Sequence, residues 1–88
     1  MKLKNEYVLQ QVADVWVVLP IGEEVLNFNS MITLNETGAF LWKKLAEGAD
    51  MQALIAALTS EYDVTAQQAQ ADTMKFCQKL HDAGCMEL

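Results

Sequence analysis

Arginine is absent from this 88-residue sequence, and its six basic residues face twelve acidic ones, for a net charge of −6. Binding to nucleic acid depends mainly on basic side chains that neutralise phosphates, and guanine is most often read by Arg. The basic residues are scattered lysines: Lys2, Lys4, Lys43, Lys44, Lys75 and Lys79. The charge balance therefore argues against nucleic acid or an anionic membrane as the partner, and it favours a basic partner.

Proline and glycine are also scarce, with one Pro and four Gly, so no segment has the composition of a disordered linker. No apolar run approaches the ~20 residues that are needed to span a bilayer. Residues 1–6 lack the apolar segment of a signal peptide. We therefore expect one small cytoplasmic domain over residues 1–88 with no membrane segment.

Cysteine and histidine, the residues of most metal and thiol chemistry, number only two and one. Cys77, His81 and Cys85 are spaced i, i+4, i+8, but Gly84 is expected to end the helix before Cys85, and a structural zinc site needs four ligands. Read as a nucleophile pair, Cys77 and His81 lack a third residue to orient the imidazole. We expect no metal, no cofactor and no enzymatic activity, and a small thiol or zinc protein is an alternative.

The N-terminal part of the chain predicts three strands. Tyr7–Val12 and Val15–Leu19 are rich in β-branched and aromatic residues, and the two residues between them are enough for a hairpin turn. Glu24–Phe28 predicts a third, short strand. An antiparallel three-stranded sheet is therefore expected before the helices begin.

Three helices are predicted in the rest of the chain, each with a residue suited to cap its N-terminus. These cap residues are Asn35, Asp50 and Thr65. Gln68 lies three residues after Thr65 and completes the pattern of a capping box. Gly48 and Gly84 suit the left-handed conformation that ends a helix, after about Glu47 and Ala83. Strands followed by helices indicate an α+β fold.

Gly38 is the unexpected residue in the first predicted helix, because Gly is about 1 kcal/mol less favourable than Ala in a helix interior. Close backbone packing explains it better than helix propensity. Phe40, Leu41 and Trp42 follow at once and supply a large apolar surface. This stretch is expected to join the sheet to the helices.

A helical wheel at ~100° per residue divides the third helix into three faces. The core stripe is Ala69, Thr73, Phe76, Leu80 and Ala83, and the solvated face is Ala71, Lys75, Gln78, Lys79 and Asp82. The stripe between them is Gln70, Met74, Cys77 and His81. This intermediate stripe either lines a binding groove, or its Met74 and Cys77 widen the core.

Three helices beside a β element suggest a winged helix-turn-helix shape, in which the second and third helices are joined by a short link. Such a shape often binds DNA, so a DNA-binding transcriptional regulator is the main alternative function. However, the would-be recognition helix carries two lysines against Asp72 and Asp82 and has no Arg. A fold of this shape with this charge is better interpreted as a scaffold used for another purpose.

The stretch from Leu34 to Trp42, Leu-Asn-Glu-Thr-Gly-Ala-Phe-Leu-Trp, resembles the hallmark of the PqqD family. The residues that follow it in the family's order are Leu45, Gly48, Leu54, Leu58, Glu61, Tyr62, Asp63, Val64, Ala71, Asp72, Phe76, Leu80, Ala83 and Gly84. The resemblance covers residues from about 7 to 86.

The resemblance implies a RiPP recognition element, a non-catalytic winged-helix domain that binds the leader segment of a ribosomally made precursor peptide. Such domains present the precursor to a modifying enzyme, commonly a radical SAM protein. In the family the leader adds as a strand to the third strand and lies beside the third helix. Placed on this sequence, the peptide-binding residues are Glu24, Val25, Leu26, Asn27, Phe28, Gln70, Met74, Cys77 and His81.

Overall fold

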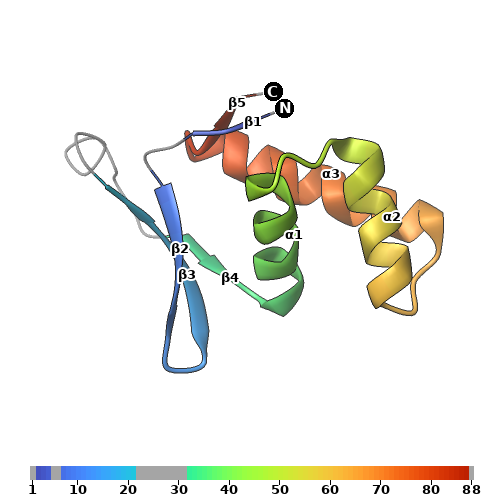
Figure 1. Cartoon of the computed structure of the whole chain (residues 1–88), viewed down its shortest axis with the longest axis horizontal. Coiled ribbons are helices and arrows are strands. Elements are labelled where there is room, and N and C mark those ends of the chain that lie inside the picture. The colour runs from blue at the N-terminus through green and yellow to red at the C-terminus, as the bar shows by residue number, and fades with distance from the viewer. Residues whose placement is uncertain (1, 5–6, 22–31, 88) are drawn as a thin grey trace.

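The computed structural model describes residues 2–4, 7–21 and 32–87, and these form five strands and three helices. The strands are β1 (Lys2–Leu3), β2 (Tyr7–Val12), β3 (Val15–Pro20), β4 (Ile32–Leu34) and β5 (Met86–Glu87). The helices are α1 (Glu36–Ala46), α2 (Met51–Glu61) and α3 (Ala66–Asp82). The expected α+β arrangement, a three-stranded antiparallel sheet followed by three helices, is confirmed (Figure 1).

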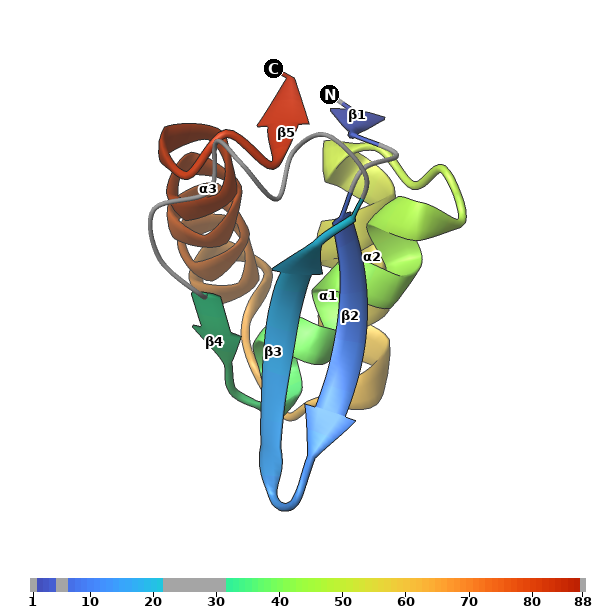
Figure 2. The same ribbon diagram turned by 90° about the vertical axis from the view of Figure 1, so that its left-hand side faces the viewer.

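The two strands predicted first form the β2–β3 hairpin, with Val12 opposite Val15 across a two-residue turn. The third strand of the described sheet is β4, which was not predicted. It pairs with β3 through Ile32 opposite Val18 and Leu34 opposite Trp16. The strand order is β2-β3-β4, so β3 is central and β4 lies at one edge (Figure 2). The predicted strand Glu24–Phe28 lies outside the described residues.

All three predicted N-caps are confirmed by hydrogen bonds from backbone N–H groups. Asn35 Oδ1 accepts from Gly38 at 2.8 Å, Asp50 Oδ1 from Ala53 at 2.9 Å, and Thr65 Oγ1 from Gln68 at 3.1 Å. The capping box at Thr65 is completed differently from the prediction, because the Gln68 amide donates to Asp72 Oδ1 at 2.8 Å. Gly48 and Gly84 have φ of +99° and +82°, as expected after the first and third helices.

The core lies between the inner face of the sheet and the helices. Its largest fully buried side chains are Leu41, Leu54, Leu58, Leu80, Met86 and Val18. The short β1 and β5 strands, which were not predicted, pair with each other next to α1 and bring the two ends of the described chain together (Figure 1). Met86 of β5 is buried, so this pairing contributes to the core.

Gly38 sits where β4, α1 and α3 meet, which confirms the expected close packing. A Cβ atom at this position would lie 3.2 Å from Leu34 Cβ and 3.3 Å from Phe76 Cε1. Trp42, one turn later in α1, is only 4% exposed. The stretch from Leu34 to Trp42 therefore joins the sheet to the helices.

Candidate functional site

The outer edge of β4 is the first feature of the candidate site. Within the described residues, β4 pairs with β3 and with no other strand. Ile32 and Leu34 are buried, and Thr33 between them is exposed. An edge strand carries backbone N–H and C=O groups that can pair with an added strand. The β4 edge therefore offers a place for an extended peptide.

Helix α3 lies beside this edge (Figure 2). Two hollows open along α3, one toward Leu34 and the start of α1, and the other toward Ile32 and Thr33. One hollow, of about 400 Å³, reaches from Leu34 and Gly38 to the middle of α3. The other, of about 700 Å³, is lined by Ile32, Thr33 and the C-terminal half of α3. Both are lined by Lys75 and Lys79 of α3, so they adjoin along the helix. We call this surface the β4–α3 groove.

A side chain of α3 already contacts the backbone of the edge strand. Lys79 Nζ donates a hydrogen bond to the Thr33 carbonyl oxygen at 3.2 Å. In an antiparallel pair, a residue points both its N–H and its C=O either toward the neighbouring strand or away from it. The Lys79 contact therefore indicates that the N–H and C=O of Thr33 point away from β3, toward the groove.

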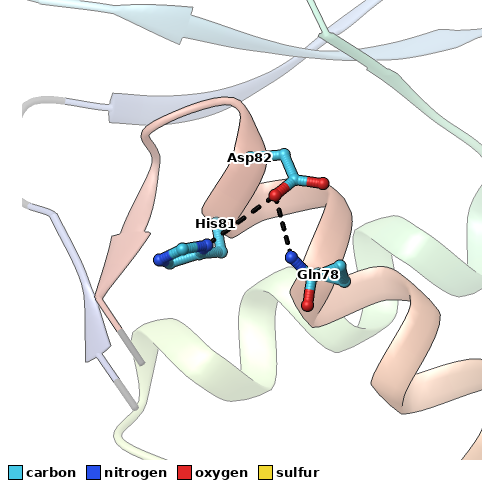
Figure 3. A network of polar contacts seen from close by, with 3 residues as sticks. All are labelled: Gln78, His81 and Asp82. Carbon is cyan, nitrogen blue, oxygen red and sulfur yellow. Dashed lines mark hydrogen bonds and ion pairs between the residues drawn. The ribbon is translucent and has the colours of Figure 1, made fainter.

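The acidic side chains of the groove have partners on their own helix. Asp72 accepts from Gln68, and Asp82 Oδ1 accepts from the Gln78 amide at 2.8 Å. Figure 3 shows that His81 also approaches Asp82, with 3.8 Å between His81 Nδ1 and Asp82 Oδ1. The carboxylates at both ends of the groove thus receive hydrogen bonds from glutamine amides.

Comparison with known proteins identifies the family of this chain. The family model described as "Coenzyme PQQ synthesis protein D (PqqD)" matches residues 6–86. The chain belongs to the PqqD family. No curated protein is significantly similar to it in sequence.

Two solved structures share the fold of this PqqD family member. One is "TbiB1 in Complex with the TbiA(beta) Leader Peptide", with 23% identity, a TM-score of 0.82, and coverage of 99% of this chain and 95% of the other. The second is "Lasso peptide synthetase B1 complexed with the leader peptide", with 26% identity, a TM-score of 0.77, and coverage of 96% and 93%. At 23% identity, the similarity to TbiB1 shows a shared fold alone.

The residues that sequence analysis placed in the groove are distributed differently in this PqqD family fold. Gln70, Met74, Cys77 and His81 do not line either hollow of the β4–α3 groove. Met74 is 55% exposed, whereas Cys77 is 2% exposed and belongs to the core. Cys77 therefore widens the core, which was the alternative interpretation of the intermediate stripe. The other three, with residues 24–28, remain predictions about peptide contacts.

The face that the wheel assigned to solvent is the one that faces β4. Lys75, Gln78, Lys79 and Asp82 all line the second hollow. The wheel gave the core stripe correctly, since Ala69, Thr73, Phe76 and Leu80 are buried and Ala83 is half-buried. A wheel fixes only the angles between side chains, so it does not say on which side of the core stripe another element packs. The sequence signal that could have indicated the groove face, and was missed, is the pair of lysines on this face, Lys75 and Lys79.

Cys77 and His81 are the thiol and the imidazole of α3. Among the described residues, no group of three or more His, Cys, Asp and Glu side chains is placed to hold a metal ion. Burial raises the pKa of the Cys77 thiol, which disfavours the reactive thiolate.

None of the helices among residues 2–4, 7–21 and 32–87 combines the length and the apolar character that crossing a bilayer requires.

Proposed function

We propose that this PqqD family member binds the leader segment of a ribosomally synthesised precursor peptide as an extra strand on β4. The observation that carries the proposal is the outward-facing edge of β4 at Thr33, next to the groove along α3. Main-chain hydrogen bonds to an edge strand supply affinity, and pockets for alternate side chains supply specificity. The described surface offers both features at one place.

The similarity to lasso peptide synthetase B1, at 26% identity, supports this assignment, because that protein is complexed with a leader peptide. A leader is disordered before it binds, and ordering such a segment costs about 2–5 kcal/mol of the gross interaction energy. The described edge of β4 is already formed, so at this edge the ordering cost falls on the peptide. Binding that is reversible, with release after modification, is the expected outcome.

The protein acts in this proposal as an adaptor, without catalysis or a cofactor. It presents the precursor to a separate peptide-modifying enzyme, for which a radical SAM protein is our candidate. The domain spans residues 1–88 and works in the cytoplasm, where the precursor is made. The two cysteines, Cys77 and Cys85, are buried thiols, and thiols persist in such a reducing compartment.

An NMR titration tests the proposal. The probe is a synthetic peptide with the N-terminal sequence of a candidate precursor, which is to be sought among short reading frames beside this gene, and a scrambled peptide of the same composition is the control. We expect amide shifts at Thr33 and in the half of α3 that includes Lys75 and Lys79. Saturable shifts confined to the exposed residues of α1 and α2 would place the peptide elsewhere and contradict the proposal.

A further inference from the structure

The lysines of this acidic protein are not equivalent, because those on α1 are held by aromatic rings. Lys43 Nζ lies 4.3 Å from the centre of the Trp16 ring, and Lys44 Nζ lies 5.5 Å from that of Phe40. Lys44 also lies 4.0 Å from Glu47. Within the described residues, the ammonium groups of Lys43 and Lys44 therefore already have partners in the protein itself.

Lys75 and Lys79 are placed differently. Both are exposed, both line the two hollows of the β4–α3 groove, and Lys75 makes no hydrogen bond or ion pair within the described residues. Lys79 Nζ is held at the sheet edge by the Thr33 carbonyl. A lysine ammonium has three N–H donors, so two remain beside the path of an added strand.

The acidic residues of the groove do not neutralise this pair directly. Asp72 and Asp82 lie at the two ends of the row, and each accepts a hydrogen bond from a glutamine. The centre of the groove therefore carries two ammonium groups one helical turn apart, in a protein whose net charge is −6. A carboxylate accepts several hydrogen bonds and can bind both ammonium groups at once.

We propose that Lys75 and Lys79 select a leader that carries an Asp or Glu at the position that faces them across the groove. The inference rests on the proposed function, since it concerns the specificity of the same site. Every second side chain of an added strand points to the same face, so one residue of the bound segment is opposite the lysine pair. Its carboxylate binds Lys75 and Lys79 while the peptide backbone pairs with Thr33.

Selection from a library of random short peptides tests this inference without knowledge of the natural leader. The wild type, the Lys75→Glu/Lys79→Glu variant and a Lys44→Glu control are each used as bait. The control changes the charge of a helix-surface lysine outside the groove. Thermal unfolding of each bait establishes that it is folded. If the double variant does not fold, the single variant Lys75→Glu replaces it as bait. Lys75 makes no polar contact within the described residues, so its replacement should not disturb the fold.

We expect the wild-type and Lys44→Glu pools to be enriched in Asp and Glu at one position, and the double variant to prefer Lys or Arg there. Replacing that acid by its amide in a selected peptide should weaken binding to the wild type by about fivefold, the upper range for an exposed ion pair. The same replacement should not weaken binding to the double variant, and high salt should reduce the difference.

Selected peptides that bind equally well to the wild type and the double variant would overturn the inference. If those peptides also lose binding when Thr33 is replaced by Pro, the proposed function stands without the acidic preference. If no peptide is enriched on any of the baits, the inference and the proposed function both fail. An acidic preference that persists in the double variant would also overturn the inference, because the lysines would not be its cause.

Discussion

Lys79 Nζ donates to the carbonyl oxygen of Thr33 at 3.2 Å, and this contact joins two segments that are 46 positions apart in the sequence. It shows which edge of the sheet faces α3, and it identifies Thr33 as the residue of β4 whose backbone points into the groove. The exposed Thr33 lies between the buried Ile32 and Leu34, so strand and helix meet at the surface above the core.

Replacing Thr33 by Pro should abolish peptide binding with little change in stability. Proline removes the backbone N–H of Thr33, which the Lys79 contact indicates to face the groove, so the ladder between β3 and β4 is expected to lose no hydrogen bond. We expect at least a tenfold loss of affinity, about 1.4 kcal/mol. Titration calorimetry with the leader peptide measures it, and Thr33→Val, which keeps the N–H, is the matched control. Equal affinity for the two variants would show that the edge is not used.

Replacing Gly38 by Leu should lower the free energy of unfolding by about 2 kcal/mol, because extra methylene groups in a packed site force their neighbours apart. The added side chain would meet Leu34 and Phe76, which already lie within 3.3 Å of the position that a Cβ atom would occupy. Urea unfolding followed by circular dichroism measures the change. Ala46→Leu, at an exposed position of the same helix, should change stability by less than about 0.5 kcal/mol. Similar values for both variants would contradict the close packing.

Replacing Thr73 by Val should raise the free energy of unfolding by about 1 kcal/mol. Thr73 is completely buried, and its Oγ1 has no hydrogen-bond partner within the described residues. A buried hydroxyl without a partner is destabilising, so a methyl group in its place removes that cost. Thr59→Val is the control, because the exposed Thr59 hydroxyl donates to the Ala56 carbonyl. A clear loss of stability in Thr73→Val would show that the hydroxyl is needed.

Cys77 should make the protein less stable in alkaline solution. Burial raises the pKa of its thiol in the folded state above the ordinary value of 9.0, so the folded state binds a proton more tightly than the unfolded state does. The resulting stabilisation is present below that ordinary value and is lost as the pH rises through the folded-state pKa. Urea unfolding between neutral pH and about pH 10 should show a shallower decline for Cys77→Ala than for the wild type. Parallel declines would indicate that Cys77 does not ionise differently on folding.

Local signals in the sequence predicted the helices well. Asn35, Asp50 and Thr65 each accept a hydrogen bond from a backbone N–H three residues later, so each cap needs only its own neighbourhood in the chain. Gly48 and Gly84 follow the same logic at the helix ends. The β2–β3 hairpin was predictable as well, because its two strands are six residues long and adjacent in sequence.

The strand at the groove was not predictable in the same way. Ile32–Leu34 is only three residues long and stands directly before the first helix cap, so its buried-exposed-buried alternation is too short to recognise. The strand predicted instead, residues 24–28, falls outside the described residues. The peptide-binding residues that were predicted in this segment therefore also lie outside the described residues.

The sequence by itself determined the α+β class, the helix boundaries, the core stripe of α3 and the family, because these depend on local spacing and on the order of residues along the chain. Only the tertiary structure decided that β4 lies next to Lys75 and Lys79, and that Cys77 points into the core. The reason is physical: side-chain periodicity fixes the angles between the faces of a helix, whereas packing against a distant strand selects which face forms the groove.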